Sequence, residues 1–81
     1  MKVEVLLFAQ FKEAYGSECL CIEVPYGTKI VDAVGRVLSE PSLQPLKNLP
    51  LRYAINEEFM LSDTLLKNND RLALLSPVAG G

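Results

Sequence analysis

The hydrophobic residues of this chain of 81 residues change their spacing part-way along it, and that change limits the fold more than any other feature. In KVEVLLF, residues 2–8, apolar and polar side chains at first alternate, which is the period of a β-strand. From Thr28, the apolar residues of TKIVDAVGRVLSE follow the i, i+4, i+7, i+8 spacing of an amphipathic helix. We expect Thr28 to cap this helix, and Pro41 to end it by disfavouring helical torsions in Glu40.

The other segments complete a strand, strand, helix, strand, strand, strand order. The further expected strands are CLCIEV (19–24), LRYAI (51–55), FML (59–61) and RLALL (71–75). The loop around residues 10–17 and the stretch 62–70 are expected to hold a helical turn each, with the residues NEE before FML forming a turn. The proline-rich stretch 41–50 is expected to be an ordered loop that contributes Leu43, Leu46 and Leu49 to the core. This order predicts an α+β domain, residues 1–75, with one main helix packed across a single sheet and a flexible tail, residues 76–81.

The charge and hydropathy patterns argue against two classes of partner. The net charge is −2, with both signs interspersed and no cluster of Lys or Arg that would bind phosphates, so we expect no nucleic acid partner. The longest apolar run, residues 5–9, is far short of the roughly 18 residues that a membrane helix needs. The acidic Glu4 also does not fit the positively charged N-terminal region of a signal peptide. These features predict a cytoplasmic protein with no membrane partner.

The chain offers few groups for catalysis or metal binding. Cys19 and Cys21 would stand roughly 6–7 Å apart on a strand, too far for a disulfide, and the chain has no histidine to complete a metal site. We expect both cysteines to pack as small apolar residues. The adjacent carboxylates Glu57 and Glu58 are expected in an exposed turn. No metal, no bound cofactor and no independent catalysis are therefore expected.

The sequence finishes on SPVAGG, and a pair of glycines in the last two places would arise by chance in roughly one chain in 200. A carboxylate is a poor electrophile, but ATP can convert it to an acyl-adenylate that a sulfur donor displaces to leave a thiocarboxylate. Gly80 and Gly81 would let the backbone enter a narrow slot with torsions that a Cβ forbids. Six extended residues reach at most about 20 Å, and Pro77 would fix one φ angle in advance.

Three stretches of the sequence are similar to one known family: VLLFAQFKE, YAINEEFMLSDTLL and NNDRLALLSPVAGG. Together with the diglycine and the order of elements, they resemble the small subunits of molybdopterin synthase, within the ubiquitin-like β-grasp family. The resemblance covers essentially the whole chain. Two places differ: residues 68–70 read NND where the family usually has a glycine-containing acidic turn, and residues 76–77 read SP where it often has two prolines.

The resemblance implies a ubiquitin-like β-grasp fold with a mixed five-stranded sheet, and a role as sulfur carrier in molybdenum cofactor biosynthesis. An E1-like adenylyltransferase would use ATP to adenylate Gly81, and a sulfurtransferase system would convert it to the thiocarboxylate. The large synthase subunit, in a heterotetramer, would use this sulfur to build the dithiolene of molybdopterin from a cyclic pyranopterin phosphate. The tail residues that would enter the partners are Pro77, Val78, Ala79 and Gly80.

Strand alternation also predicts the surface that meets the large subunit. If Val3, Val5 and Leu7 face the helix, then Leu6 and Phe8 point to the other side of the sheet. The same alternation places Leu72 and Leu74 in the core and leaves Ala73 and Leu75 beside Leu6 and Phe8. We expect Phe8, Phe59 and Leu75 to dock on the large subunit.

Three alternatives share the same features. The chain could carry sulfur for thiamine-thiazole synthesis or tRNA thiolation, in which case a different acceptor protein would co-purify with it. It could be a protein modifier conjugated to lysines through Gly81, and the conjugates would then survive reducing, denaturing gels. It could also be a structural interaction domain, in which case removal of Gly80 and Gly81 would change nothing.

Overall fold

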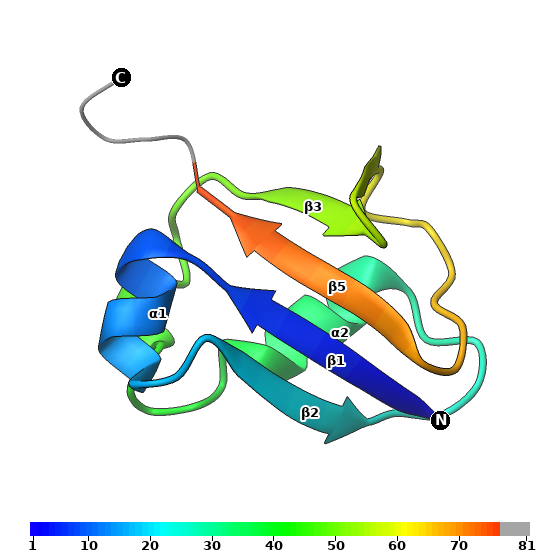
Figure 1. Cartoon of the computed structure of the whole chain (residues 1–81), viewed down its shortest axis with the longest axis horizontal. Helices are drawn as coiled ribbons and strands as arrows, with labels where there is room; N and C mark the ends of the chain where they lie inside the picture. Colours follow the sequence, from blue (N-terminus) through cyan, green and yellow to red (C-terminus); the bar gives the residue numbers. More distant parts are fainter. Residues whose placement is uncertain (77–81) are drawn as a thin grey trace.

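The computed structural model describes residues 1–76, which form five strands, two α-helices and one short 3-10 helix (Figure 1). In chain order these are β1 (Lys2–Leu7), α1 (Ala9–Tyr15), β2 (Cys19–Glu23), α2 (Ile30–Val37), η1 (Gln44–Leu46), β3 (Arg52–Ile55), β4 (Glu58–Met60) and β5 (Asp70–Leu75). The tail residues singled out above, Pro77, Val78, Ala79, Gly80 and Gly81, lie outside the described residues. The division into a domain and a flexible tail therefore stays a prediction.

The sheet is mixed, as the resemblance predicts, with the strand order β2-β1-β5-β3-β4. The neighbouring central strands β1 and β5 run parallel, while β1–β2, β3–β5 and β3–β4 are antiparallel pairs. The first and last strands of the described chain thus lie side by side in the middle of the sheet (Figure 1). Consequently β1 and β5 together determine where residue 76 and the tail leave the domain.

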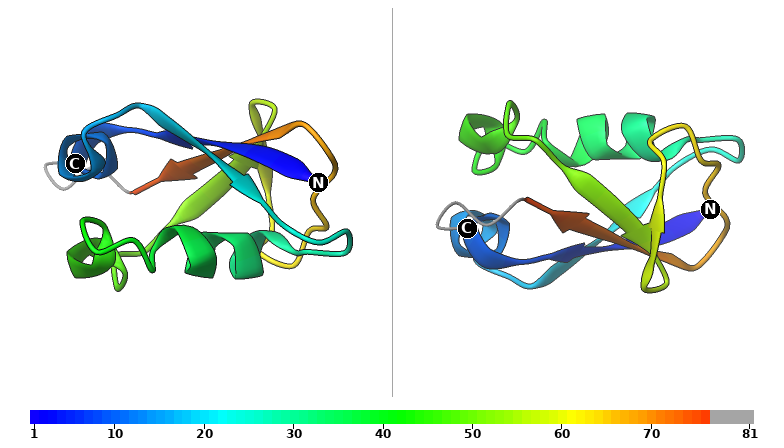
Figure 2. Two further views of the ribbon diagram at one scale, coloured as in Figure 1. Left: turned by 90° about the horizontal axis from the view of Figure 1, so that it is seen from below. Right: turned by 90° about the horizontal axis from the view of Figure 1, so that it is seen from above.

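The molecule has two layers, with α2 and the segment that follows it on one face of the sheet (Figure 2). The core between the layers contains the residues that alternation predicts: Val3, Val5, Leu7, Leu72 and Leu74, each at most 1% exposed. The helix α2 contributes Ile30, Ala33, Val34 and Val37 to the same core. Leu43 is fully buried, and Leu46 and Leu49 pack against the core, as expected for the loop after α2. The opposite face of the sheet carries no second layer among residues 1–76 (Figure 2).

The first helix is longer than the helical turn expected for this loop. Phe11 is fully buried, and Tyr15, four residues later, also packs against the core, so one side of α1 is held by the domain. Gly16 ends α1 with a left-handed φ of 89°, and its N–H donates to the Lys12 carbonyl. A helix of seven residues is too short for its hydrophobic spacing to show that it packs against residues distant in sequence.

The expected cap and stop of α2 are both wrong. The Thr28 hydroxyl donates to the Pro25 carbonyl, and the helix begins at Ile30, whose N–H donates to the Thr64 carbonyl. A neighbouring loop therefore supplies the acceptor that a side-chain cap would otherwise provide. The helix ends at Val37, before the expected stop at Pro41, because the chain continues in tighter turns.

Residues 62–70 form turns around an isolated antiparallel bridge between Lys29 and Leu65, so the helical turn expected there is wrong. The fourth strand begins one residue earlier than expected, at Glu58. The turn before it uses only Asn56 and Glu57, with φ of 50° and 73°. Positive φ at both central residues is the type I′ geometry that matches the twist of a two-residue hairpin.

Candidate functional site

A row of side chains crosses all five strands on the uncovered face of the sheet. The register pairs Cys19 with Leu6, Leu6 with Ala73, Ala73 with Ala54, and Ala54 with Phe59. Residues that are directly opposite in neighbouring strands share a face, so this row is continuous from edge to edge. Phe59, on the edge strand β4, remains 65% exposed although it is large and apolar. We call these five residues the apolar row.

Phe8 and Leu75 extend the apolar row toward the end of the sheet where β5 finishes. Phe8 follows β1 and is 46% exposed, and Leu75 is the last residue of β5 and half-buried. Arg52, paired with Leu75, places its guanidinium carbon 6.0 Å from the centre of the Phe59 ring. Phe8 and Leu75 line a shallow groove of about 570 Å³ together with four members of the apolar row, Leu6, Ala54, Phe59 and Ala73. The structure thus brings Phe8, Phe59 and Leu75 to one surface, as predicted.

A polar region borders the groove on the side away from Leu75. Arg71 Nε lies 3.1 Å from Glu4 Oε1, and these neighbours in the β1–β5 register are two residues along from Leu6 and Ala73. Asn56 accepts the Arg71 N–H through its side-chain oxygen and donates its own backbone N–H to the Arg71 carbonyl. The uncovered face therefore has an apolar half near the tail and a charged half away from it.

The bend at residues 68–70 explains how the chain departs from the family pattern without losing the turn. Asn69 has a left-handed φ of 69°, which asparagine tolerates better than most residues with a Cβ. The Asn68 side chain accepts the Lys2 N–H at 2.8 Å. The buried Asp70 carboxylate accepts the Lys67 N–H at 2.7 Å and a hydrogen bond from the Asn56 side chain at 3.3 Å. Asn69 therefore adopts the left-handed backbone conformation that glycine adopts easily because it has no side chain.

The origin of the tail is tied to α1. Gln10 Nε2 donates to Ser76 Oγ at 3.3 Å, and both side chains are half-buried. These residues are 66 positions apart, and no sequence pattern connects them. The contact fixes the last described residue against the first helix.

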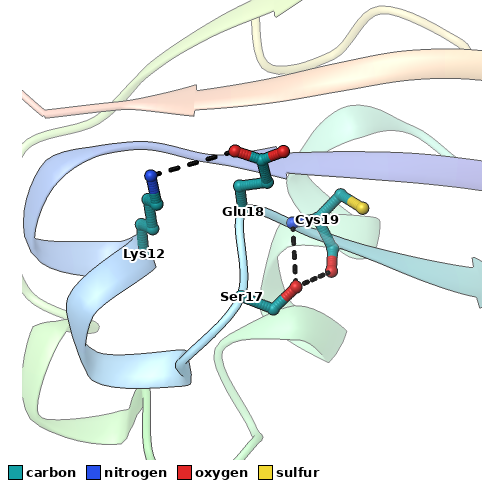
Figure 3. Close-up of polar contacts among 4 residues, drawn as sticks. All are labelled: Lys12, Ser17, Glu18 and Cys19. Carbon is teal, nitrogen blue, oxygen red and sulfur yellow. Dashed lines mark hydrogen bonds and ion pairs between the residues drawn. The ribbon is translucent and has the colours of Figure 1, made fainter.

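The two cysteines, expected to pack as small apolar residues, differ in their exposure. Cys19 is half-buried and Cys21 is exposed, and both are free thiols. Figure 3 shows the loop before Cys19, where Lys12 Nζ lies 3.8 Å from Glu18 Oε2. The Ser17 hydroxyl donates to the Cys19 carbonyl at 3.0 Å and accepts the Cys19 N–H at 3.4 Å. The packing expected for Cys21 is wrong, because its side chain lies on the uncovered face of the edge strand β2, whereas Cys19 is partly packed beside Leu6.

The two adjacent glutamates singled out in the sequence lie on the surface of the described domain. Glu57 and Glu58 are exposed, as expected. Within residues 1–76, no group of three or more His, Cys, Asp or Glu side chains could hold a metal ion. In the same part of the chain, no helix has the length and apolar character required to cross a membrane.

Comparisons with known proteins decide the family. Residues 5–81 match the ThiS family. The chain belongs to this family. It is 32% identical, over its whole length, to the molybdopterin synthase sulfur carrier subunit of Arabidopsis thaliana, 84% of which is covered. The resemblance to sulfur carriers that the sequence suggests is thereby confirmed.

Solved structures agree with the fold. One is a chain in a protein–protein complex of subunits 1 and 2 of the molybdopterin-converting factor of Helicobacter pylori, with 26% identity, a TM-score of 0.72 and full coverage of both chains. Another is small archaeal modifier protein 1 of Methanosarcina acetivorans, with 28% identity and a TM-score of 0.78 over 99% of this chain and 96% of that one. The predicted ubiquitin-like β-grasp fold is confirmed.

Proposed function

We propose that this chain is the sulfur carrier subunit of a molybdopterin synthase and acts as a co-substrate, without catalysing a reaction on its own. The observation that carries the proposal is the apolar row beside the origin of a diglycine tail, in a chain 32% identical to a named sulfur carrier subunit. A large exposed apolar surface on a small domain marks a protein interface. The role places the chain in molybdenum cofactor biosynthesis.

The chemistry of the proposal takes place on the carboxylate of Gly81. An E1-like adenylyltransferase joins this carboxylate to the α-phosphate of ATP and releases pyrophosphate. Sulfide-level sulfur from a sulfurtransferase system then displaces AMP and leaves a thiocarboxylate. Two such sulfurs, one from each of two loaded carriers, pass to a cyclic pyranopterin phosphate to form the dithiolene, and hydrolysis returns each carboxylate. ATP and the pterin belong to the partner enzymes, and this chain binds no cofactor in the scheme.

The docking surface of the proposal is the groove with Phe8, Phe59 and Leu75 on its rim. The Helicobacter pylori complex, which pairs a similar chain with a second subunit, supports a large-subunit partner. Each large apolar side chain that is fully buried on binding adds about 1.5–3 kcal/mol of favourable free energy. In the proposed heterotetramer, two carriers and two large subunits would each use one such surface.

The tail of the proposal enters the partner's active site from the edge of this surface. Leu75 lies at the groove and Ser76 follows it directly, so residues 77–81 start where the partner would sit. Gly80 and Gly81 would pass a slot too narrow for side chains, and Pro77, Val78 and Ala79 would line its entrance. The reach of this segment keeps the domain outside the active site.

The proposal assigns the sulfur to Gly81 and not to a cysteine. Lys12, the cation nearest to Cys19 in sequence, is paired with Glu18. A reducing compartment keeps surface thiols in the free form, which supports a cytoplasmic location for the proposed reactions. A variant with both Cys19 and Cys21 replaced by alanine should therefore still be loaded with sulfur and transfer it.

The decisive experiment is coexpression with the activating enzyme and the sulfurtransferase, followed by intact mass spectrometry. The expected result is the mass change for one oxygen replaced by sulfur, together with product formation once the large subunit and precursor are added. A variant lacking Gly80 and Gly81 is the control and should show neither. A wild-type chain that gains no sulfur under these conditions contradicts the proposal.

A protein modifier is the second candidate, favoured by the 28% identity to small archaeal modifier protein 1 of Methanosarcina acetivorans. A modifier would form an isopeptide bond between Gly81 and a lysine of a target protein. Such conjugates survive reducing, denaturing gels, whereas a thiocarboxylate leaves no conjugate there. The same lysate, probed with an antibody to this chain, separates the two functions.

A further inference from the structure

We infer that Gln10 is a positioning residue, which holds the root of the tail in the direction required for sulfur transfer. The inference rests on the proposed function, since it concerns how the tail reaches the partner's active site. Its basis is the hydrogen bond from Gln10 Nε2 to Ser76 Oγ, the described contact between a side chain of α1 and the root of the tail. None of the three residues of the docking surface, Phe8, Phe59 and Leu75, makes this contact.

The backbone at the start of α1 is bent in a way that presents Gln10 to Ser76. Phe8 is extended, and Ala9 then adopts a left-handed φ of 47° before the helix continues. This conformation costs a residue with a Cβ roughly 1–2 kcal/mol, so the surrounding contacts must hold it in place. Phe8 lines the groove and Phe11 is fully buried in the core, so the backbone is held in place on both sides of Gln10.

Further contacts make α1 a rigid support. Phe11 and Tyr15 pack against the core, and the Phe11 N–H donates to the Phe8 carbonyl at 3.0 Å. At the other end, the Lys12–Glu18 ion pair joins α1 to the loop before β2 (Figure 3). A side chain mounted on this helix is therefore held in a fixed position relative to the sheet.

The direction of the chain at Ser76 matters because five residues follow it in the sequence. Extended, they reach at most about 18 Å, so a swing of about 10° at the root would move the reacting carbon by roughly 3 Å. A misplacement of even about 1 Å can cost 10²-fold in rate. One hydrogen bond that narrows the swing therefore raises the fraction of docked carriers that are ready to react, without adding to the docking surface.

The test uses the purified thiocarboxylate form of the whole chain, the large subunit and the pterin precursor, in single-turnover transfer. Gln10→Met keeps the side-chain length but removes the donor, and Gln44→Met is the matched control, because Gln44 lies in η1 among the elements on the opposite face. The Gln10 variant should lower the transfer rate at saturating large subunit about three- to tenfold, the size of one neutral hydrogen bond. The dissociation constant for the large subunit and the melting temperature should stay at the wild-type values, and Gln44→Met should leave all three unchanged.

Ser76 supplies the coupling test. Ser76→Ala should lower the rate as much as Gln10→Met, and the double variant should be no slower than either single one, because all three lack the same bond. Ser76→Thr keeps the hydroxyl and should restore a rate near that of the wild type. In NMR spectra of the free chain, Ser76→Ala should shift the side-chain amide signals of Gln10 and leave those of Gln44 in place.

Four results would overturn the inference. The first is a Gln10→Met chain that transfers sulfur at the wild-type rate, and the second is a loss of rate that weaker docking explains entirely. The third is a double variant whose loss of rate is the product of the two single losses. The fourth is that the Gln10 side-chain amide signals do not shift in Ser76→Ala. Failure of the proposed function looks different, because the wild-type chain itself would then transfer no sulfur. The inference would fall with it, while the NMR result would still report whether the hydrogen bond exists.

Discussion

Cys19 lies directly opposite Leu6 in the antiparallel pairing of β1 with β2, and this places its side chain at one end of the apolar row. Cys21, two residues further, is opposite Glu4 and therefore belongs to the charged half of the same face. The two thiols lie on the same strand and on the same face of the sheet. They differ in their distance from the proposed docking surface.

This difference predicts a thiol footprint. Binding of the large subunit should slow alkylation of Cys19 by at least about tenfold, because Cys19 lines a neighbouring hollow that shares Leu6 and Phe8 with the groove, and should slow alkylation of Cys21 much less. Each thiol can be followed alone, in a Cys21→Ser chain and a Cys19→Ser chain, by mass spectrometry with time. Equal protection of both thiols, or none, would mean that the partner binds elsewhere.

Phe59→Asp should weaken docking strongly while the domain stays folded. Phe59 is 65% exposed, so the free energy of unfolding should change by less than about 1 kcal/mol. Buried at an interface, the same carboxylate would be desolvated without a partner, and we expect the dissociation constant to rise about 30-fold or more.

Leu65→Asp is the matched control for Phe59→Asp, since Leu65 is 57% exposed but bridges Lys29 on the side of α2. Titration calorimetry with the large subunit compares the two variants. Similar losses of affinity would show that any added negative charge weakens the complex, and would remove the support for this groove.

Two glycine substitutions should change stability in opposite directions. Gly35 lies in an exposed part of α2, and a Cβ built there meets no atom within 4 Å, so Gly35→Ala should raise the free energy of unfolding by about 0.5–1 kcal/mol. Gly16 also has open space around it but has a φ of +89°, so Gly16→Ala should lower the free energy of unfolding by about 1 kcal/mol. Urea unfolding measures both. A stabilising Gly16→Ala would contradict the assigned end of α1.

Alternation within strands was enough to predict which residues of β1 and β5 face the core and which remain outside. Val5 and Leu6 are neighbours in sequence, yet one is fully buried and the other faces the groove, as a period of two requires. The same rule found Phe8 and Leu75, because they continue the pattern of strands that are strongly periodic.

Contacts between segments that are distant in sequence could not be predicted from alternation or from local motifs. Thr28 has the right chemistry for a helix cap, but the Pro25 carbonyl competes for its hydroxyl, and the Thr64 carbonyl takes over the helix start. The single bridge of Leu65 is too short to show a period. Gln10 and Ser76 meet only because β1 and β5 are adjacent and parallel, which is a property of the sheet and not of either local sequence.

The last prediction is that activation depends on Gly81 being both glycine and the final residue. Adenylation requires a free α-carboxylate at a fixed distance from the docked domain. One added residue moves that carbon by about 3.5 Å, well beyond the roughly 1 Å that can already cost 10²-fold in rate. The extended chain should fold, bind the large subunit with wild-type affinity and fail to form the adenylate.

Gly81→Ala is the milder counterpart of this extension, since the carboxylate keeps its place and only a Cβ is added inside a slot shaped for backbone. It should slow adenylation without abolishing it, and a ranking of wild type, then Gly81→Ala, then the extended chain follows from the geometry alone. Release of pyrophosphate with the cognate activating enzyme measures the first step, and product formation with the large subunit measures the second. A chain extended by one non-cleavable residue that is activated at the full rate would show that the diglycine is not the working end, since no fixed reach from the docked domain could then be required.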